Sequence, residues 1–193
     1  MQKFKVKLEG VTSYLQHRMD EQKLEAWEKQ RGFVVERDDV NKEDAVRAEF
    51  HSYRNADGKY FIPSSQIRGA LIIAGTYVKG KVGTQTKSMK STVAAMFYPE
   101  EDEIILKPQT YAIRKDSAVN RNVKARIIVI RPEFKNWSCE FTLIVDNDTI
   151  TKETVEKIIE YAGQYVGIGA WRPTNNGMFG RFKIAQFKPI KAS

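Results

Sequence analysis

The chain has 193 residues, of which 41% are apolar and 29% are charged, and its formal net charge is +8 at pH 7. This composition excludes an intrinsically disordered chain, and no apolar run reaches the roughly 18 residues that a membrane span requires. The single cysteine, Cys139, excludes an internal disulfide framework and predicts a reducing, cytoplasmic setting. Few histidines and cysteines argue against a metal or cofactor site, whereas the positive charge favours a polyanionic partner.

The first third of the chain predicts a strand, a short helix and a hairpin. Residues 2–10 alternate apolar side chains with lysines, which is typical of a half-buried strand. Residues 20–32 predict a short helix that begins at an aspartate and ends at a glycine. Residues 45–63 predict a β-hairpin, because Asp57-Gly58 is the strongest short hairpin signal in the sequence.

The central part predicts a helix and then a loop. Residues 64–79 begin with two serines that suit a helix cap, and they place five apolar side chains on one helical face: Ile67, Ala70, Leu71, Ala74 and Val78. Gly69 and Gly75 each cost about 1 kcal/mol inside a helix, and we expect close packing of the helix on a sheet to be their use. Residues 80–92 are rich in glycine, lysine and hydroxyl side chains, which predicts a mobile loop.

The remaining residues predict strands around a second helix. Residues 103–108 predict a short strand, and residues 125–146 predict two strands around a turn at 132–136. Residues 151–166 predict an amphipathic helix with acidic residues early, and residues 180–190 predict the final strand.

Setting aside insertions at about 11–63 and 80–123, the predicted order is strand, helix, two strands, helix, strand. This order predicts a single domain over residues 1–193 of the α+β class, with a ferredoxin-like (RRM-like) antiparallel sheet and two helices on one face. The other face of such a sheet is open, and many readers of single-stranded RNA are built in this way.

Two segments resemble the RAMP superfamily, the RNA-binding proteins that form the backbone of CRISPR effector complexes. They are "IPSSQIRGAL" at 62–71 and the glycine-rich "GIGAWRPTNNGMFGRFKI" at 167–184, and the resemblance covers about half of the chain. Ser65 replaces part of the usual first motif, and no arginine follows Leu71. The resemblance implies RNA binding by subunits that often lie side by side along one strand, and a stand-alone phage or mobile-element member also fits this length.

The glycine-rich segment is the first candidate site. Its spacing follows a helix and precedes a strand, which is the reverse of a dinucleotide-binding fingerprint. Glycines there permit positive φ and close approach to phosphate, arginines can contact phosphates, and aromatic rings can stack on bases. The candidate residues are Gly167, Gly169, Trp171, Arg172, Gly177 and Arg181. The alternative is a tight helix-to-strand connection with Trp171 and Phe179 in the core.

Three further basic groups extend the candidate interface. Lys79, Lys81, Lys87 and Lys90 can wrap a phosphate backbone, or they serve only to solvate a loop. Residues 80–123 resemble in length and position the thumb of RAMP backbone subunits, and they contribute to a cluster of Arg114, Arg121, Lys124 and Arg126. Arg126 and Arg131 differ by five positions and therefore face opposite sides of a regular strand. Arg68 lies one turn into a helix whose N-terminal amides attract anions.

Catalysis is the weaker reading of the sequence. The resemblance implies that some relatives cut RNA with a histidine, or with a thumb aspartate and a metal, which points to His17 or Asp116. We expect His51 on a strand pointing outward, and Asp146 and Asp148 at a helix cap rather than at a cation site.

The leading hypothesis is therefore a non-enzymatic protein that binds single-stranded nucleic acid, RNA first and DNA second, through its phosphate backbone. Homo-oligomers or effector-complex subunits along the strand are the expected partners. One alternative is a RAMP-like endoribonuclease. The other is a protein-interaction module, such as a phage factor that docks on a CRISPR or replication complex.

Overall fold

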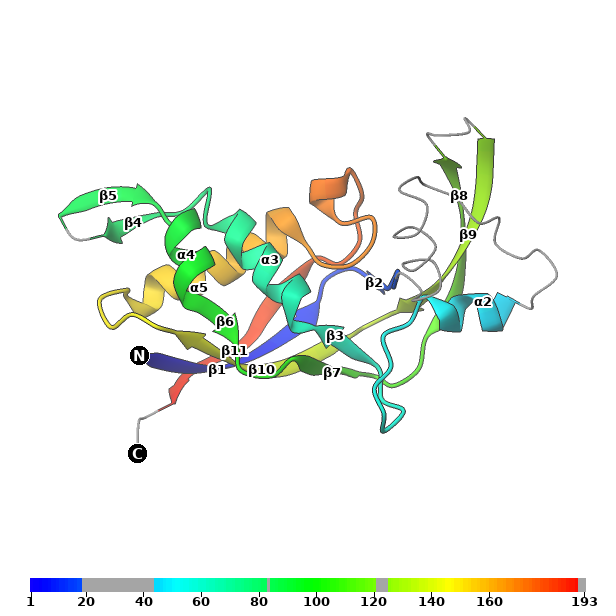
Figure 1. Cartoon of the computed structure of the whole chain (residues 1–193), viewed down its shortest axis with the longest axis horizontal. Coiled ribbons are helices and arrows are strands. Elements are labelled where there is room, and N and C mark those ends of the chain that lie inside the picture. Colours follow the sequence, from blue (N-terminus) through cyan, green and yellow to red (C-terminus); the bar gives the residue numbers. More distant parts are fainter. Residues whose placement is uncertain (19–43, 83, 121–124, 191–193) are drawn as a thin grey trace, which may run out of the picture.

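The computed structural model describes residues 1–18, 44–82, 84–120 and 125–190 (Figure 1). Its main sheet has the order β11–β1–β10–β7–β3, with β6 also paired to β10, and the pairings are antiparallel. The strands of this sheet are β1 (Gln2–Gly10), β3 (Phe61–Pro63), β6 (Phe97–Pro99), β7 (Glu103–Lys107), β10 (Ser138–Val145) and β11 (Phe182–Ile190).

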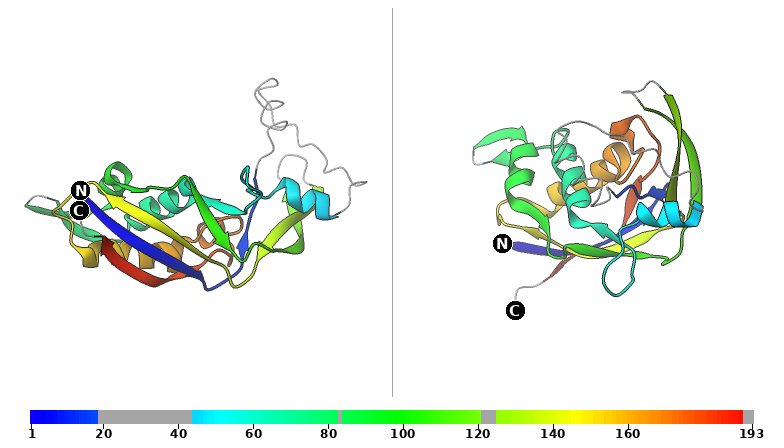
Figure 2. Two further views of the ribbon diagram at one scale, coloured as in Figure 1. Left: turned by 90° about the horizontal axis from the view of Figure 1, so that it is seen from below. Right: turned by 45° about the vertical axis from the view of Figure 1, so that its right-hand side comes forward.

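The helices gather on one face of this sheet. They are α3 (Ser64–Ala74), α4 (Lys90–Met96) and α5 (Lys152–Tyr161), which continues into the π-helical turn η1 (Ala162–Val166). Figure 1 shows them above the strands, and the view from below in Figure 2 shows the strands in front of them. The chain order β1, α3, β7, β10, α5, β11 and the spatial order β11–β1–β10–β7 are those of a ferredoxin-like fold, so the predicted fold class is confirmed. One of the two predicted middle strands is wrong, because residues 103–107 of the expected insertion pair in the main sheet whereas residues 125–134 belong to a separate sheet. None of the helices described is long and apolar enough to cross a membrane.

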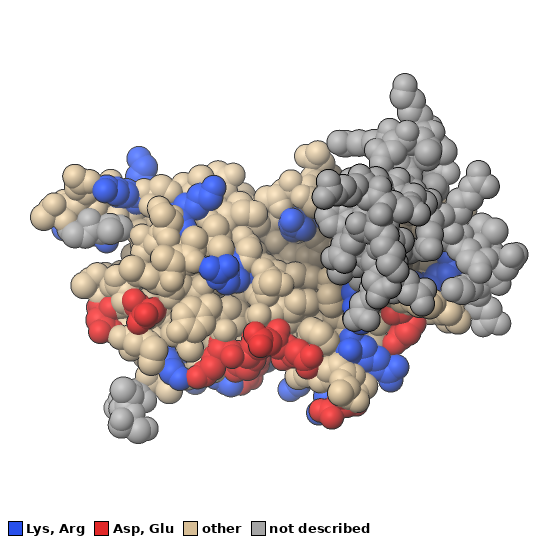
Figure 3. Space-filling view, viewed as in Figure 1, with Lys and Arg blue, Asp and Glu red and all other residues tan. Residues whose placement is uncertain are grey.

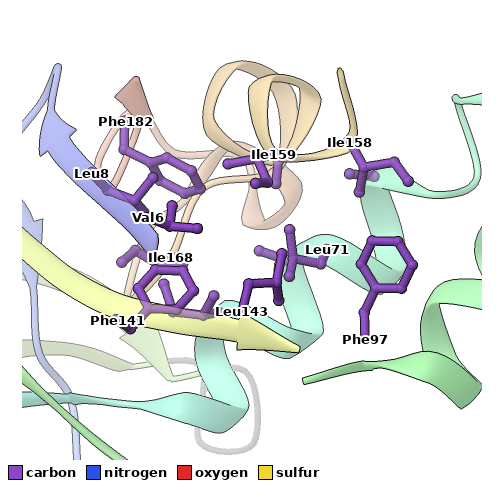
Figure 4. Packing of buried hydrophobic residues seen from close by; sticks show 14 of the residues in the cluster. Val6, Leu8, Leu71, Phe97, Phe141, Leu143, Ile158, Ile159, Ile168 and Phe182 are labelled. Carbon is purple, nitrogen blue, oxygen red and sulfur yellow. The ribbon is translucent and has the colours of Figure 1, made fainter. Parts of the chain in front are cut away.

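Local sequence explains where α5 begins and which side chains form the core beneath the helices. Thr151 caps α5, because its hydroxyl accepts a hydrogen bond from the Thr154 amide at 3.3 Å. The apolar positions of β1 alternate inward and meet those of β10, α3 and α5, as Figure 4 shows. Each fully buried aliphatic or aromatic side chain of this kind contributes about 1.5–3 kcal/mol relative to exposure. The labelled core residues are Val6, Leu8, Leu71, Phe97, Phe141, Leu143, Ile158, Ile159, Ile168 and Phe182.

The sheet face away from the helices carries paired charges along β1. The Lys3 ammonium lies 2.5 Å from the Glu100 carboxylate, and Lys5 lies 3.0 Å from Glu140. Stacking platforms of RRM proteins place aromatic rings on this face, whereas β1 places lysines there. Ion pairs of this exposure add little stability, but each of these two pairs offsets a lysine charge with a glutamate. A nucleic-acid interface is therefore better sought on the helical side.

The first insertion differs in part from its prediction. Residues 45–63 do not form a hairpin along their whole length, because the first arm is the helix α2 (Asp44–Phe50). The run consists mostly of good helix formers, and its Ala48 is buried where α2 packs on β9. The predicted turn is present, since Gly58 has φ 76° and its amide donates to the Asn55 carbonyl at 3.0 Å. The helix predicted at 20–32 lies outside the described residues.

Two hairpins project from opposite ends of the molecule (Figure 1). The first, β4 (Lys79–Val82) with β5 (Gln85–Ser88), replaces the loop predicted at 80–92. It packs closely at its base, because a Cβ on Gly80 would lie 2.6 Å from the Met89 sulfur. The second, β8 (Ala112–Asn120) with β9 (Ala125–Phe134), is longer, and the short strand β2 (Tyr14–Leu15) also pairs with β9.

Burial of the only cysteine yields a prediction about alkaline conditions. Loss of solvation in the core raises the pKa of the Cys139 thiol from 9.0 to about 12. The folded chain thus keeps a proton that the unfolded chain releases above about pH 9, so raising the pH favours unfolding through this group. We expect iodoacetamide at pH 8 to label Cys139 in urea and to leave the native protein unlabelled, as mass spectrometry can measure. Equal labelling rates in both states would contradict this burial.

Candidate nucleic-acid interface

The two segments that resemble the RAMP superfamily meet in one cleft. Residues of α3 form one wall, and the end of η1 with the glycine-rich loop forms the other. The cleft has a volume of about 230 Å³. Its lining residues are Ser65, Gln66, Gly69, Ala70, Ile73, Val166, Gly167, Ile168, Gly169 and Arg172. Sequence positions about one hundred residues apart are thereby brought to one place.

Close packing of backbone on backbone holds the glycine-rich loop. Gly180 has φ 68°, and a Cβ there would lie 1.8 Å from the Ile168 carbonyl oxygen. A Cβ on Gly177 would lie 1.8 Å from the Trp171 carbonyl oxygen. The loop's own folding therefore requires these glycines, as the alternative of a tight helix-to-strand connection predicted. Gly167 and Gly169 also line the cleft.

Gly69 is the exception among the glycines that the structure describes. A Cβ built on Gly69 would meet no atom within 4 Å, although the residue lies inside α3 and lines the cleft. The expected close packing on a sheet is therefore wrong for Gly69, and Gly75 packs instead on the start of α4, where its Cβ would lie 3.0 Å from the Lys90 Cα. Glycine costs about 1 kcal/mol in a helix, and no internal contact in the described structure offsets that cost at Gly69. What the missing side chain leaves is open space in the cleft wall.

Three polar side chains line this space, those of Ser65, Gln66 and Arg172. Arg172 is held in place by two bonds, from Nε to the Thr174 hydroxyl at 3.0 Å and from a terminal nitrogen to the Gly169 carbonyl at 3.0 Å. The opposite wall begins at the first turn of α3, whose N-cap is Pro63 and has no side-chain cap. Amides of a helix N-terminus attract anions. No acidic residue lines the cleft in the described part of the chain. The site thus suits an acceptor-rich anionic group.

Two predicted arginines lie near the cleft but do not line it. A guanidinium nitrogen of Arg68 donates to the Ala94 carbonyl at 2.6 Å, which ties α3 to α4. The Arg181 side chain donates to the Gln164 carbonyl, and its backbone amide donates to the Thr12 hydroxyl at 3.0 Å. Both side chains hold neighbouring elements together.

The predicted lysines form a separate basic surface. Lys79, Lys81, Lys87 and Lys90 are all exposed, on the β4–β5 hairpin and at the start of α4. The sequence has no acidic residue between Asp57 and Glu100, so α3, this hairpin and α4 carry positive charge alone. In the view of Figure 3 the acidic side chains gather in the lower half, and the upper half left of the grey atoms shows Lys and Arg.

Arginines of the β8–β9 hairpin cover the aromatic rings of the glycine-rich loop. The Arg114 guanidinium lies 4.5 Å from the Phe179 ring centroid, and that of Arg131 lies 5.3 Å from the Trp171 ring centroid. Trp171 has φ 50°, an uncommon conformation for a bulky residue that marks stored strain. Both rings are half-buried rather than sealed in the core.

Asp116 connects these two arginines. Its carboxylate lies 2.9 Å from Arg114 and 3.6 Å from Arg131, and its side chain is only 7% exposed. Both ion pairs lie within the hairpin, and they hold the two arginines where their cation–π contacts reach the loop. Arg121 and Lys124 lie outside the described residues. Of Arg126 only the backbone is described, and it lies in β9 opposite Val119 of β8.

The histidines occupy a different arrangement from the one predicted. His51 is buried after α2 instead of pointing outward from a strand, and its ring stacks on that of His17 at 4.3 Å. Arg131 Nε donates to His17 Nδ1 at 3.2 Å. Asp146 and Asp148 do not cap a helix, because Thr151 caps α5 and Asp148 binds the amino terminus. Within the described residues, no three His, Cys, Asp or Glu side chains gather as a metal site would need.

Sequence reasoning missed the cleft residue Gln66 and the buried Tyr14 beneath it. Gln66 lines the cleft and accepts a hydrogen bond from the buried Tyr14 hydroxyl at 3.0 Å. Position in the first turn of α3 was the only signal for Gln66. No local pattern pointed to Tyr14, because β2 lies fifty residues before that helix.

The role of Asp116 predicts a stability effect. Asp116→Asn removes a buried negative charge and leaves the Arg114 and Arg131 guanidinium groups facing a neutral amide. Breaking one side of a buried ion pair costs about 3 kcal/mol, so we expect a lower urea midpoint of unfolding. Asp148→Asn, at an exposed pair, is the matched control and changes stability by less than about 1 kcal/mol. Equal midpoints for both variants would show that the Asp116 connection is not structural.

Comparison with known proteins supports the fold. No family model and no curated protein matches the sequence. The chain is similar to a chain of the Type III-B Cmr-beta complex bound to cognate target RNA, which was solved by cryo-EM. The two have a TM-score of 0.51 and 12% sequence identity, and the match covers 100% of this chain. It covers 61% of the other chain, so this chain spans about three fifths of that length. At this identity the likeness is one of fold.

Proposed function

We propose that this protein binds single-stranded nucleic acid, RNA ahead of DNA, by holding its phosphate backbone, and that it does so without cutting it. The observation that carries the proposal is the cleft between α3 and the glycine-rich loop, whose lining includes Ser65, Gln66 and Arg172 and no acidic side chain among the described residues. A phosphate group is an anionic acceptor, and backbone amides with a positioned arginine are its usual partners in proteins.

Two independent findings favour RNA as the first choice. The segments at 62–71 and 167–184 resemble the RAMP superfamily, and these are the segments that meet in the cleft. The similar solved structure is a CRISPR complex bound to target RNA. On this proposal the chain is a RAMP-like domain over residues 1–193 that works as a subunit of an RNA-binding assembly. Copies bind side by side on a strand that is longer than one site.

The basic surface beyond the cleft extends the grip. Lys79, Lys81, Lys87 and Lys90 project into solvent from elements that carry no acidic residue, so they can follow a flexible backbone without reading bases. Trp171 has one face toward Arg131, and its remaining surface is what a base can stack on. The interface therefore combines one shaped site for phosphate with a charged surface of low specificity.

The nuclease alternative has a specific difficulty at Asp116. Its carboxylate is occupied by two arginines and nearly excluded from solvent, whereas a metal-assisted cut requires a carboxylate that is free to bind a cation. Incubating the protein with labelled RNA, with and without Mg²⁺, decides between binding and cleavage. Cleavage that is lost in His17→Ala would replace this proposal by the endoribonuclease.

Salt dependence tests the phosphate grip. We expect labelled single-stranded RNA to bind more tightly than single-stranded DNA or duplex, with an affinity that falls about 50-fold from 50 to 200 mM salt if four phosphates are contacted. Arg172→Ala lowers the affinity and makes the salt dependence shallower, because one charge in the cleft is lost. Lys157→Ala removes an exposed charge from α5 and serves as the matched control. Negligible binding even at low salt, with a co-purifying protein, would support the interaction module instead.

Gly69 allows a test that separates binding from stability. Gly69→Ala adds a methyl group that meets no protein atom within 4 Å, and alanine is the better helix former by about 1 kcal/mol. We therefore expect an unchanged or higher melting temperature together with weaker RNA binding, because Gly69 lines the cleft and the methyl group adds volume to its wall. Fluorescence anisotropy and thermal unfolding measure the two effects on one sample. A more stable variant that binds RNA like the wild type would remove the cleft from the interface.

A further inference from the structure

A hydrogen bond from the buried Tyr14 hydroxyl orients the side-chain amide of Gln66. Gln66 Oε1 accepts a hydrogen bond from the Tyr14 hydroxyl at 3.0 Å. An amide whose oxygen is occupied in this way presents its nitrogen, with two N–H donors, on the other side. In the described part of the chain Gln66 Nε2 has no acceptor within hydrogen-bond distance, and Gln66 lines the cleft. The side chain is therefore a donor that the protein itself leaves unused.

The surroundings of Tyr14 fix the direction of this bond. Tyr14 is completely buried, and burial raises the pKa of its hydroxyl far above the usual value, so the hydroxyl keeps its proton at any physiological pH. A buried hydroxyl proton needs an acceptor. The Gln16 side chain also interacts with the Tyr14 hydroxyl, while its oxygen accepts from the Tyr53 amide at 2.7 Å and its nitrogen donates to the Phe61 carbonyl at 2.9 Å.

Tyr14 also touches the opposite wall of the cleft. A Cβ on Gly169 would lie 2.6 Å from the Tyr14 ring, so this part of the glycine-rich loop rests directly on it. The Ala170 amide donates to the Leu15 carbonyl at 2.9 Å, which fastens the loop to the strand that carries Tyr14. One buried residue thus contacts both walls, by a hydrogen bond on the α3 side and by its ring on the loop side.

We propose that Gln66 is a specific hydrogen-bond donor to a phosphate oxygen of the nucleic acid in the cleft, and that Tyr14 is the positioning residue that orients it. The inference rests on the proposed function and adds to it a neutral contact next to the charged one from Arg172. A phosphate oxygen is an acceptor only, and it therefore matches an amide that offers only donors. A carboxylate at position 66 accepts a hydrogen bond from the Tyr14 hydroxyl equally well, but it has no donor to offer and repels phosphate.

A double-mutant cycle with labelled oligouridine RNA tests both residues. Tyr14→Phe keeps the ring and removes the hydroxyl, and Gln66→Met keeps the length of the side chain and removes its donors. We expect Gln66→Met to weaken binding by about tenfold and Tyr14→Phe by about threefold, as is usual for one lost hydrogen bond. The double variant should bind no more weakly than Gln66→Met alone, because Tyr14 acts through Gln66. The salt dependence should stay at the wild-type slope in all three, since no charge is removed.

The controls separate this inference from the function beneath it. Thermal unfolding of each variant reports damage to the core, and Gln66→Glu should bind more weakly than Gln66→Met at equal stability. Wild-type binding by Gln66→Met, or multiplicative losses in the cycle, would overturn the inference while leaving RNA binding intact. Failure of the wild type to bind any single-stranded nucleic acid at low salt would overturn the proposed function itself.

Discussion

The close approach of backbone to backbone in the glycine-rich loop is the constraint on which the rest of the site depends. The Gly180 backbone lies so near the Ile168 carbonyl that no side chain fits between them, and the Gly180 amide donates to the Ser13 carbonyl at 2.8 Å. These contacts press the loop against the segment that follows β1. The loop therefore ends opposite the first turns of α3, and the cleft is what remains between the two.

The same loop position determines what its aromatic residues can do. Trp171 and Phe179 lie next to each other through the hydrogen bond from the Phe179 amide to the Trp171 carbonyl at 3.0 Å, and each ring is covered on one side by an arginine of the long hairpin. Asp116 keeps both arginines in place. The base of the hairpin and the loop are thus connected. Arg114, which the sequence predicts to contact nucleic acid, has a structural role here.

Charge is distributed unevenly over the fold, and this gives the molecule two different surfaces. The lysines of β1 are matched by glutamates across the sheet, as in the Lys5–Glu140 pair at 3.0 Å. The stretch between Asp57 and Glu100 has no acidic residue to match its lysines and arginine, and it forms α3, the short hairpin and α4. The described helical side therefore carries a run of positive charge without acidic neighbours in sequence, and such a run attracts a polyanion.

The ferredoxin-like fold class was predictable from the sequence alone, although the structure uses residues 103–107 rather than 125–134 as one of the middle strands. Alternation in residues 2–10 and the helical period of 64–79 and 151–166 are local signals, because side-chain spacing within one element determines which face is buried. The segments at 62–71 and 167–184 were recognisable as candidates for the same reason. Local signals are weaker for short elements. The sequence therefore predicts a strand where the structure has α2, and a loop where it has the β4–β5 hairpin.

Only the tertiary structure decided what the candidate residues do. Gly69 faces open space while Gly180 is enclosed, and nothing in their local sequence distinguishes these environments. Arg172 lines the cleft, whereas Arg114 is occupied by Asp116 and Phe179. The pairing of Tyr14 with Gln66 joins positions 52 residues apart. Contacts of this kind arise when separately formed elements pack together, and the chain carries no local period or spacing that encodes them.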